Sequence, residues 1–185
     1  MSSALNPEAE FAYGAGQINP VKAVRPGLVY DISESDYVRF MCGQGYNTTN
    51  LRSITSEGIN CKKIENETVW DLNLPSFALK RNVSEYFSNT FHRTVTNVGE
   101  DSSIYKAKLI VPPSLLTIQV TPNVLSFSYV GEKKSFTVTI EGTISVGIVS
   151  SSLFWDDGNF QVRSLIVFYI YRVLLHDCHR HEIFA

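Results

Sequence analysis

The chain has 185 residues, of which 44% are hydrophobic, 12% aromatic and 18% charged, and its formal net charge is -2. This length allows one domain, or one domain joined to part of another, with enough apolar side chains for a real core. The small net charge gives no case for binding nucleic acid or an acidic membrane surface. A charged content below the usual quarter favours a β-rich extracellular protein.

The first 31 residues predict an extended segment that is interrupted by glycines and prolines. Met1–Glu10 contains no apolar run of the kind found in signal peptides, and Val21–Val24 forms at most a short turn. Several apolar side chains in this segment need a partner, and we expect a larger body to cover them. They are Phe11, Tyr13, Ile18, Leu28, Val29 and Tyr30.

Two short helices are expected next. Ser33 is followed three residues later by Asp36, which is a signature of a helix start, and the helix is predicted over residues 33–46. A second short helix is predicted near Thr49–Thr55. Residues 56–68 are then a polar linker.

Cys42 and Cys61 flank the polar loop that contains the second helix, and they are natural disulfide partners. Oxidation would close a loop of 19 residues and contribute roughly 3 kcal/mol in the chain-entropy model. The alternative is a pair of reduced thiols in a cytosolic chain. Cys178 is left over near the end of the sequence.

Three Asn-x-Ser/Thr sequons lie within about forty residues, at Asn47, Asn66 and Asn82. Each lies in a polar stretch, and together they favour a secreted glycoprotein with N-glycans at these three positions.

From Val69 onward, apolar residues recur with a period of two, and turn signals follow about every ten residues. About seven short strands in this pattern predict an antiparallel β-sandwich. The clearest runs are Phe91–Asn97, Leu116–Val120, Phe136–Ile140, Val146–Trp155 and Phe160–Tyr169.

Residues that could carry chemistry are few. His92 lies in a strand, and we expect it to face solvent or satisfy a turn, without an oriented carboxylate beside it. His176–His181 contains residue types that ligate zinc or copper, but its spacing matches no closed site and predicts a non-functional tail. Asp156–Gly158 predicts a turn rather than a calcium loop. Leu165–Leu175 is too short for a membrane span, so we predict no metal site, no cofactor and no membrane contact.

Several blocks of this sequence resemble one family. Phe11–Ala23 and Pro26–Asp31 resemble the last segment of the protease domain in plant subtilisin-like proteases of the cucumisin-like group. Trp70–Phe77 is similar to the start of that family's C-terminal domain, and Phe91–Gly99 to its most recognisable strand and turn. The resemblance covers about residues 1–169, and it implies a fibronectin type III-like domain in the second half.

The resemblance also implies a division of the chain. Residues 1–68 are expected to be the incomplete end of a subtilisin-type α/β peptidase domain, residues 69–169 the fibronectin type III-like sandwich, and residues 170–185 a divergent tail. The family has a cysteine at each of the two positions, which favours the Cys42–Cys61 bridge.

The family is secreted to the apoplast and hydrolyses peptide bonds with a Ser-His-Asp triad. Its triad Asp and His, its oxyanion Asn and its Gly-Thr-Ser motif belong upstream of these blocks, so we predict no catalytic residue in this chain. The expected partner is the protease domain of the parent enzyme, within the same polypeptide in relatives.

Two hypotheses follow. In the first, the chain is a C-terminal segment of a secreted serine endopeptidase, is inactive alone, and its sandwich braces the protease domain. In the second, the sandwich is a stand-alone binding module for a protease or another extracellular protein. The apolar residues of Phe11–Asp31 argue against the second, because they would lack a partner.

Arg93 and Arg163 are expected to pair with carboxylates, either across the sandwich or toward the protease domain.

Overall fold

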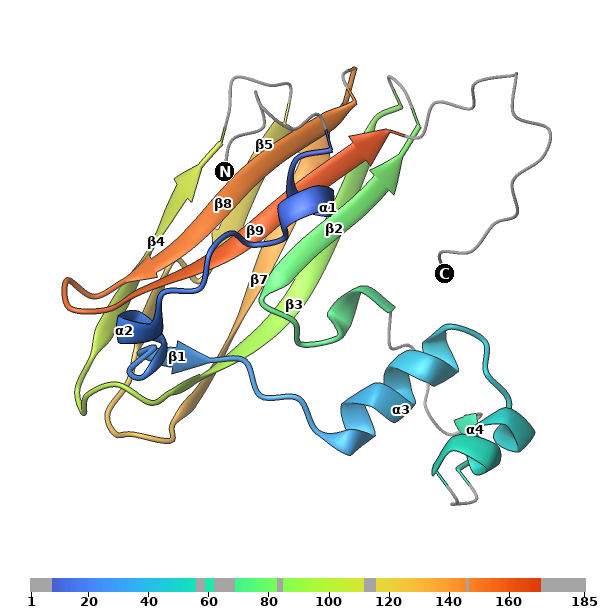
Figure 1. Cartoon of the computed structure of the whole chain (residues 1–185), viewed down its shortest axis with the longest axis horizontal. Helices are drawn as coiled ribbons and strands as arrows, with labels where there is room; N and C mark the ends of the chain where they lie inside the picture. The colour runs from blue at the N-terminus through green and yellow to red at the C-terminus, as the bar shows by residue number, and fades with distance from the viewer. Residues whose placement is uncertain are drawn as a thin grey trace.

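The computed structural model describes residues 8–55, 59–61, 69–82, 85–111, 116–145 and 147–170. Two β-sheets face each other and form a sandwich, as the alternating pattern predicts (Figure 1). An N-terminal segment crosses one face of the sandwich, and a pair of helices projects from one end.

The first sheet has four strands in the order β1-β3-β7-β5, and each neighbouring pair is antiparallel. The strands are β1 (Leu28–Val29), β3 (Phe87–Asn97), β7 (Lys133–Gly142) and β5 (Leu116–Thr121). The β1 strand is short and covers only the last two residues of the β3 edge, so the rest of that edge needs other partners.

The second sheet has five strands in the order β2-β9-β8-β4-β6. They are β2 (Ser76–Arg81), β9 (Gln161–Ile170), β8 (Ile148–Asp156), β4 (Ile104–Ile110) and β6 (Val124–Ser126). The β2–β9 pair is parallel, with Ser76 opposite Leu165, whereas the other pairs are antiparallel. A period of two indicates which face of the sheet each side chain occupies, but not whether neighbouring strands run parallel or antiparallel. The parallel pairing of β2 and β9 therefore could not be predicted from the sequence.

The core lies between the sheets and is rich in aromatic residues. Trp155, Tyr105 and Phe168 are fully buried, and Phe91 and Phe136 are each 2% exposed. The rings of Phe136 and Trp155 meet edge to face with centroids 5.0 Å apart. Such pairs add about 1 kcal/mol to the burial of their large apolar surfaces.

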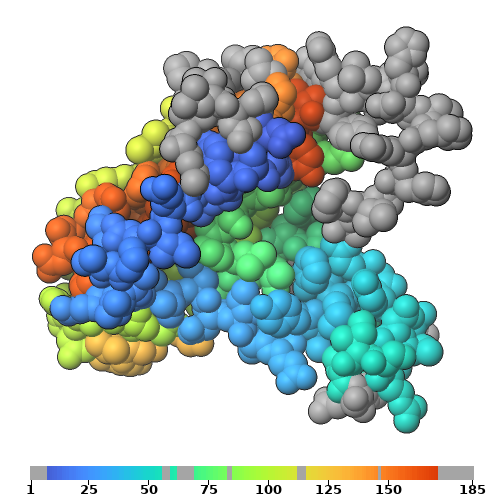
Figure 2. Space-filling view, viewed as in Figure 1, coloured from blue at the N-terminus to red at the C-terminus, as the bar shows by residue number. Residues whose placement is uncertain are grey.

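Residues 8–31, here called the strap, contain α1 (Glu10–Tyr13), α2 (Pro20–Ala23) and β1. Drawn in blue, the strap runs across the outer face of β8 and β9 (Figures 1 and 2). Phe11 packs edge to face on Tyr169 at 4.8 Å, and Ser150 donates a hydrogen bond to Glu10. Leu165, which alternation places on the same face of β9 as Tyr169, is also buried.

Residues 33–55 and 59–61 form a helical lobe that contains α3 (Glu34–Gly43) and α4 (Thr48–Thr55). Both predicted helices are confirmed, and Ser33 caps the first as expected, with its N–H 2.8 Å from Asp36 Oδ2. The lobe projects away from the sandwich in Figure 1, and α3 meets the sandwich side mainly at the 3₁₀ turn η2 (Val69–Asp71). Within the described part of the chain, no helix is both long and apolar enough to cross a membrane.

Candidate functional site: the joint between strap and sandwich

Arg93 connects the segment that precedes β2 to strand β3. Its side chain lies on the core side of β3 and the residue is 4% exposed. Its Nε donates to the carbonyl of Leu74 at 2.9 Å, and one terminal nitrogen donates to the carbonyls of Trp70 and His92, both at 2.8 Å. The guanidinium also lies over the ring of Phe77, 4.7 Å from its centroid.

The hydrogen-bond acceptors of Arg93 are backbone carbonyls. Burial lowers the pKa of Arg93 to about 10, an effect that the nearby charge of Asp71 opposes, so the side chain remains cationic at neutral pH. Among the described residues, the hydrogen bonds found for Arg93 and Arg163 go to carbonyls and a hydroxyl rather than to carboxylates across the sandwich. The alternative, pairing with carboxylates of the protease domain, stays a prediction. Arg163 donates to the hydroxyl of Ser152 at 3.1 Å and to the carbonyl of Ala15, in the strap, at 3.4 Å.

Two side chains cover the edge of β3 where β1 has ended. Asn73 Nδ2 donates to the carbonyls of Asp31 and Thr94 at 2.9 and 2.8 Å, and its Oδ1 accepts from the Thr94 N–H at 2.8 Å. Asp71 Oδ1 accepts from the backbone N–H of His92 at 2.8 Å. Asp71 and Asn73 thus replace a neighbouring strand, and Asn73 links the strap, the segment before β2 and β3.

The end of the strap is fixed by two further contacts. The Tyr30 hydroxyl lies 2.7 Å from Ser164 Oγ, and burial raises the pKa of Tyr30. Asp31 accepts a hydrogen bond from the Thr96 hydroxyl and pairs with Lys133 Nζ at 3.2 Å. The Thr96 bond, followed by the interactions with Lys133, holds the pKa of Asp31 below its ordinary value.

Two glycines allow the strap to approach the sandwich closely. Gly27 has φ +83°, and a Cβ there would lie 2.6 Å from Phe160 Cβ and 2.8 Å from the Tyr105 hydroxyl. Its carbonyl accepts from the Val98 N–H at 2.8 Å. A Cβ on Gly99 would lie 3.3 Å from the Gly27 Cα. Gly27 therefore requires glycine for both conformation and space, whereas a Cβ on Gly99 would require its neighbours to move by a few tenths of an ångström.

Asn97 completes this joint from the side of β3. It is fully buried, and its Nδ2 donates to the carbonyls of Glu100 at 2.8 Å and Tyr129 at 3.3 Å, while its Oδ1 accepts from the Gly99 N–H at 3.1 Å. The Phe91–Gly99 block thus has a physical role, because its polar residues and its glycine hold the strap and the adjoining turns against the sandwich.

A polar hollow of about 610 Å³ lies beside this joint. Its walls include Asp31, Asp71, Asn73, His92 and Lys133, together with hydroxyl side chains of β3 and β7. The polar groups named here already bond to one another or to backbone groups, as described above. The hollow is therefore better explained as the polar surface of the joint than as a site built around a ligand.

His92 is the one histidine among the residues that the structure describes. Its side chain is 64% exposed, as expected for a solvent-facing position. The expectation that it lacks an oriented carboxylate is wrong, since Asp71 Oδ1 lies 3.1 Å from His92 Nδ1. The sequence did not indicate this pair, because Asp71 lies 21 residues away at the end of the short 3₁₀ turn η2, which no sequence pattern predicted.

A nucleophile does not complete this pair. Thr137 lies opposite His92 in the β3–β7 ladder, and its hydroxyl donates to the carbonyl of Thr121 at 3.2 Å. The hydroxyls of Thr94 and Ser135 bond to each other at 2.8 Å. Within the described ranges, no hydroxyl is hydrogen bonded to the His92 ring, so a Ser-His-Asp arrangement is not assembled there.

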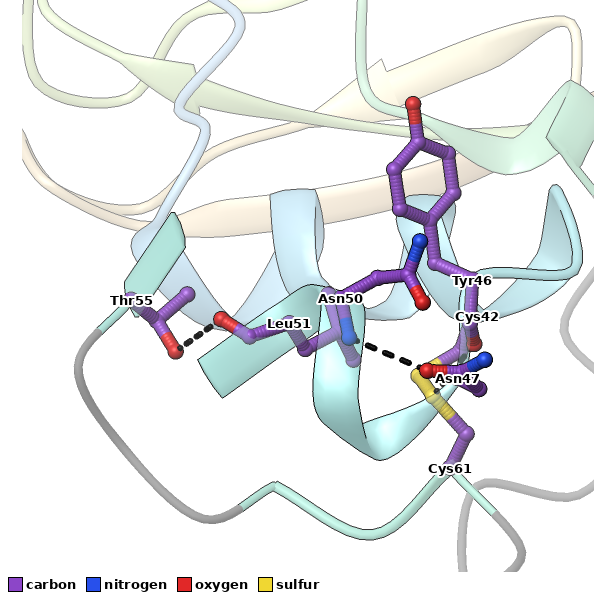
Figure 3. Close-up of a disulfide and its surroundings, with 7 residues drawn as sticks. All are labelled: Cys42, Tyr46, Asn47, Asn50, Leu51, Thr55 and Cys61. Carbon is purple, nitrogen blue, oxygen red and sulfur yellow. Dashed lines mark hydrogen bonds between the residues drawn. A yellow bond between two sulfur atoms is a disulfide. The ribbon is translucent and has the colours of Figure 1, made fainter. Parts of the chain in front are cut away.

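The predicted disulfide partners lie together in the helical lobe. Cys42 and Cys61 are joined with an S–S distance of 2.09 Å and a Cα–Cα distance of 5.4 Å (Figure 3). Of the three predicted glycan acceptors, Asn47 is exposed at the start of α4, and Asn82 follows β2 and donates to Glu85 at 2.8 Å. Asn66 and the tail residues His176–His181 lie outside the described residues.

The apolar residues of the strap divide into two groups. Leu28 is 2% exposed and belongs to the sandwich core, and Tyr30 packs against that core, so these two need no further body to cover them. Ile18 and Val21 are each 86% exposed, and Val24 is 81% exposed. These three leave an apolar surface on the strap.

A family model described as a fibronectin type-III domain matches residues 71–168. The subtilisin-like protease SBT4.3 of Arabidopsis thaliana is 44% identical over 171 residues, which is 91% of this chain and 23% of that protein. SBT4.9 of the same plant is 47% identical over 170 residues, which is 89% of this chain and 23% of that protein. The chain belongs to the plant subtilisin-like protease family.

This chain corresponds to the C-terminal part of the subtilisin-like proteases and spans about a quarter of the length of the two relatives. Among solved structures, a FixG-related protein from Vibrio parahaemolyticus aligns with 46% of this chain and 80% of its own, with a TM-score of 0.38 and 12% identity. That likeness is too low to support an argument about this subtilase.

Proposed function

We propose that this chain is the C-terminal part of a secreted plant serine endopeptidase, and that its strap and sandwich together hold the end of the protease domain in place. The observation that carries the proposal is the position of the strap. The strap resembles the last segment of the protease domain, yet β1, Leu28 and Tyr30 are built into the sandwich. A segment shared in this way couples the two domains mechanically.

The exposed side of the strap supplies the second contact. Ile18, Val21 and Val24 point away from the sandwich interior, and their exposure is far above that of a buried interface residue. In the parent enzyme they would pack on the upstream protease domain. The same surface disfavours a stand-alone binding module, because three neighbouring apolar side chains would remain in water.

The 185-residue chain by itself is proposed to be inactive. Its described histidine has a carboxylate partner but no bonded nucleophile, and loss of triad members in a subtilisin lowers turnover by up to about a millionfold. Purified protein is expected to show no peptide hydrolysis and no labelling by a fluorophosphonate probe. Stoichiometric labelling of one serine that His92→Ala abolishes would contradict the proposal.

A chimera tests the bracing role. The matched C-terminal residues of SBT4.9 are replaced by this chain, and secreted peptidase activity per mole of mature protein is measured. Activity is expected with the unaltered strap and is expected to fall at least tenfold with Ile18→Asp and Val21→Asp combined. Ile104→Asp and Ile110→Asp, at exposed positions of β4, are the matched control. Equal activity of the two double variants would contradict this role.

A further inference from the structure

The side-chain oxygen and the side-chain nitrogen of Asn47 lie in different environments. Its side-chain oxygen accepts a hydrogen bond from the Asn50 N–H at 3.0 Å, and its backbone carbonyl accepts from the Leu51 N–H at 3.0 Å. Asn47 therefore caps the N-terminus of α4. In Figure 3 its Oδ1 faces Asn50 while its Nδ2 points away from the helix, and Nδ2 takes part in none of the hydrogen bonds found among the described residues.

The same residue begins the sequon Asn47-Thr48-Thr49, all of which the structure describes. Asn47, Thr48 and Thr49 are exposed, so a bulky group on Nδ2 meets no packed surface. The neighbouring Cys42–Cys61 bridge fixes the turn that precedes the sequon, since Cys61 Sγ lies 3.3 Å from the carbonyl of Tyr46.

We propose that Asn47 carries an N-linked glycan and at the same time caps α4 through its amide oxygen. The inference rests on the proposed function in one respect, which is that the protein passes through the secretory route. In the transfer, Nδ2 bonds to the anomeric carbon of an oligosaccharide linked to a polyprenyl diphosphate. The carbon–oxygen bond to the diphosphate breaks, the diphosphate leaves, and one amide proton is lost to the transferase. The amide oxygen is untouched, so the cap survives modification.

Three variants separate the glycan from the cap. Thr49→Ala removes the sequon and leaves both groups of Asn47 in place. Asn47→Ser removes the glycan but keeps a side-chain oxygen that is a good N-cap, whereas Asn47→Ala removes both. The lobe lies apart from the sandwich core, so all three variants are expected to be secreted and folded.

The experiment uses the whole chain secreted from plant cells behind a heterologous signal peptide, so its outcome is independent of the natural route. Glycopeptide mass mapping is expected to find Asn47 occupied, and occupancy is expected to vanish in Thr49→Ala. An unmodified Asn47 in the secreted protein would overturn the inference without touching the proposed function.

Hydrogen exchange of the Asn50 and Leu51 amides tests the cap. The glycosylated protein, Thr49→Ala and Asn47→Ser are expected to exchange within about twofold of one another, and Asn47→Ala roughly fivefold faster, as loss of a typical cap implies. If the glycosylated protein exchanges as fast as Asn47→Ala, the glycan and the cap exclude each other and the inference fails.

Discussion

The strap and the helical lobe are neighbours in sequence, but different forces hold them. The strap contributes Leu28 to the sandwich core, pairs β1 with β3, and is bound by Tyr30 and Asp31 to side chains of the sandwich. The lobe has a small interior in which Val38 and Leu51 are buried, and its own disulfide closes it.

This difference shows that segments assigned to one domain by sequence resemblance need not pack together as one structural unit. The division into residues 1–68, 69–169 and 170–185 remains a prediction about the origin of the segments. The contacts, by contrast, group the strap with the sandwich and leave the lobe as a satellite. The stability of the isolated chain should therefore be sensitive to substitutions at the joint between strap and sandwich, and much less sensitive to substitutions on the outer side of the strap.

Arg93→Ala is expected to have the largest effect. It removes a buried cation and leaves the carbonyls of Leu74 and Trp70 without their donor, which should lower the free energy of unfolding by about 4 kcal/mol. Urea denaturation followed by tryptophan fluorescence measures the change. The control is Arg163→Ala, at an exposed position, for which about 0.5 kcal/mol is expected. Equal losses would show that the joint is not centred on Arg93.

Leu28→Ala tests whether the strap belongs to the core. The side chain is 2% exposed, and its truncation should cost about 3 kcal/mol through lost burial and the cavity left behind. Ile18→Ala, at 86% exposure on the same strap, should change the urea midpoint little. Similar small losses for both would mean that the strap is only loosely attached.

Gly27→Ala measures how closely the strap approaches the sandwich. The added Cβ meets Phe160 and Tyr105 at a positive φ, so about 2 kcal/mol or more should be lost, seen as a drop of several degrees in Tm. Gly131→Ala has a similar φ of +91° with no atom within 4 Å of the new Cβ, and so reports the conformational cost alone. A smaller loss at Gly27 than at Gly131 would contradict the close approach.

Much of this architecture could be predicted from the sequence. The period-two runs predicted the sandwich, and Ser33 with Asp36 predicted the start of α3. The parallel β2–β9 pair and the role of Asn73 could not be predicted, because both depend on which distant segments meet. The position of Arg93 in the Phe91–Gly99 block marked it as a candidate residue. Its acceptors, the carbonyls of Trp70 and Leu74, could not be predicted, because the segment before β2 has no periodic pattern.

Acid is expected to weaken the end of the strap slightly. The pKa of Asp31 is held below its ordinary 3.8 by Thr96 and Lys133, so its charged form stabilises the fold above about pH 4, and this contribution is lost as the pH falls through the lower folded value. Because Asp31 is exposed, Asp31→Asn should reduce the stability difference between pH 6 and pH 3 by only about 0.5 kcal/mol. Glu34→Gln serves as the control in the same titration. An unchanged pH dependence in Asp31→Asn would show that the contacts of Asp31 with Thr96 and Lys133 do not stabilise the fold.

The central claim is that the strap, and not the lobe, belongs to the sandwich. A pair of deletions followed by urea denaturation tests it most directly. Removal of residues 1–32 should lower the free energy of unfolding by about 4 kcal/mol or more, because Leu28 and Tyr30 leave the packed surface. Replacement of residues 34–68 by a short Gly/Ser linker should leave the sandwich within about 1 kcal/mol of the full chain. A sandwich that tolerates loss of the strap but unfolds without the lobe would contradict this account.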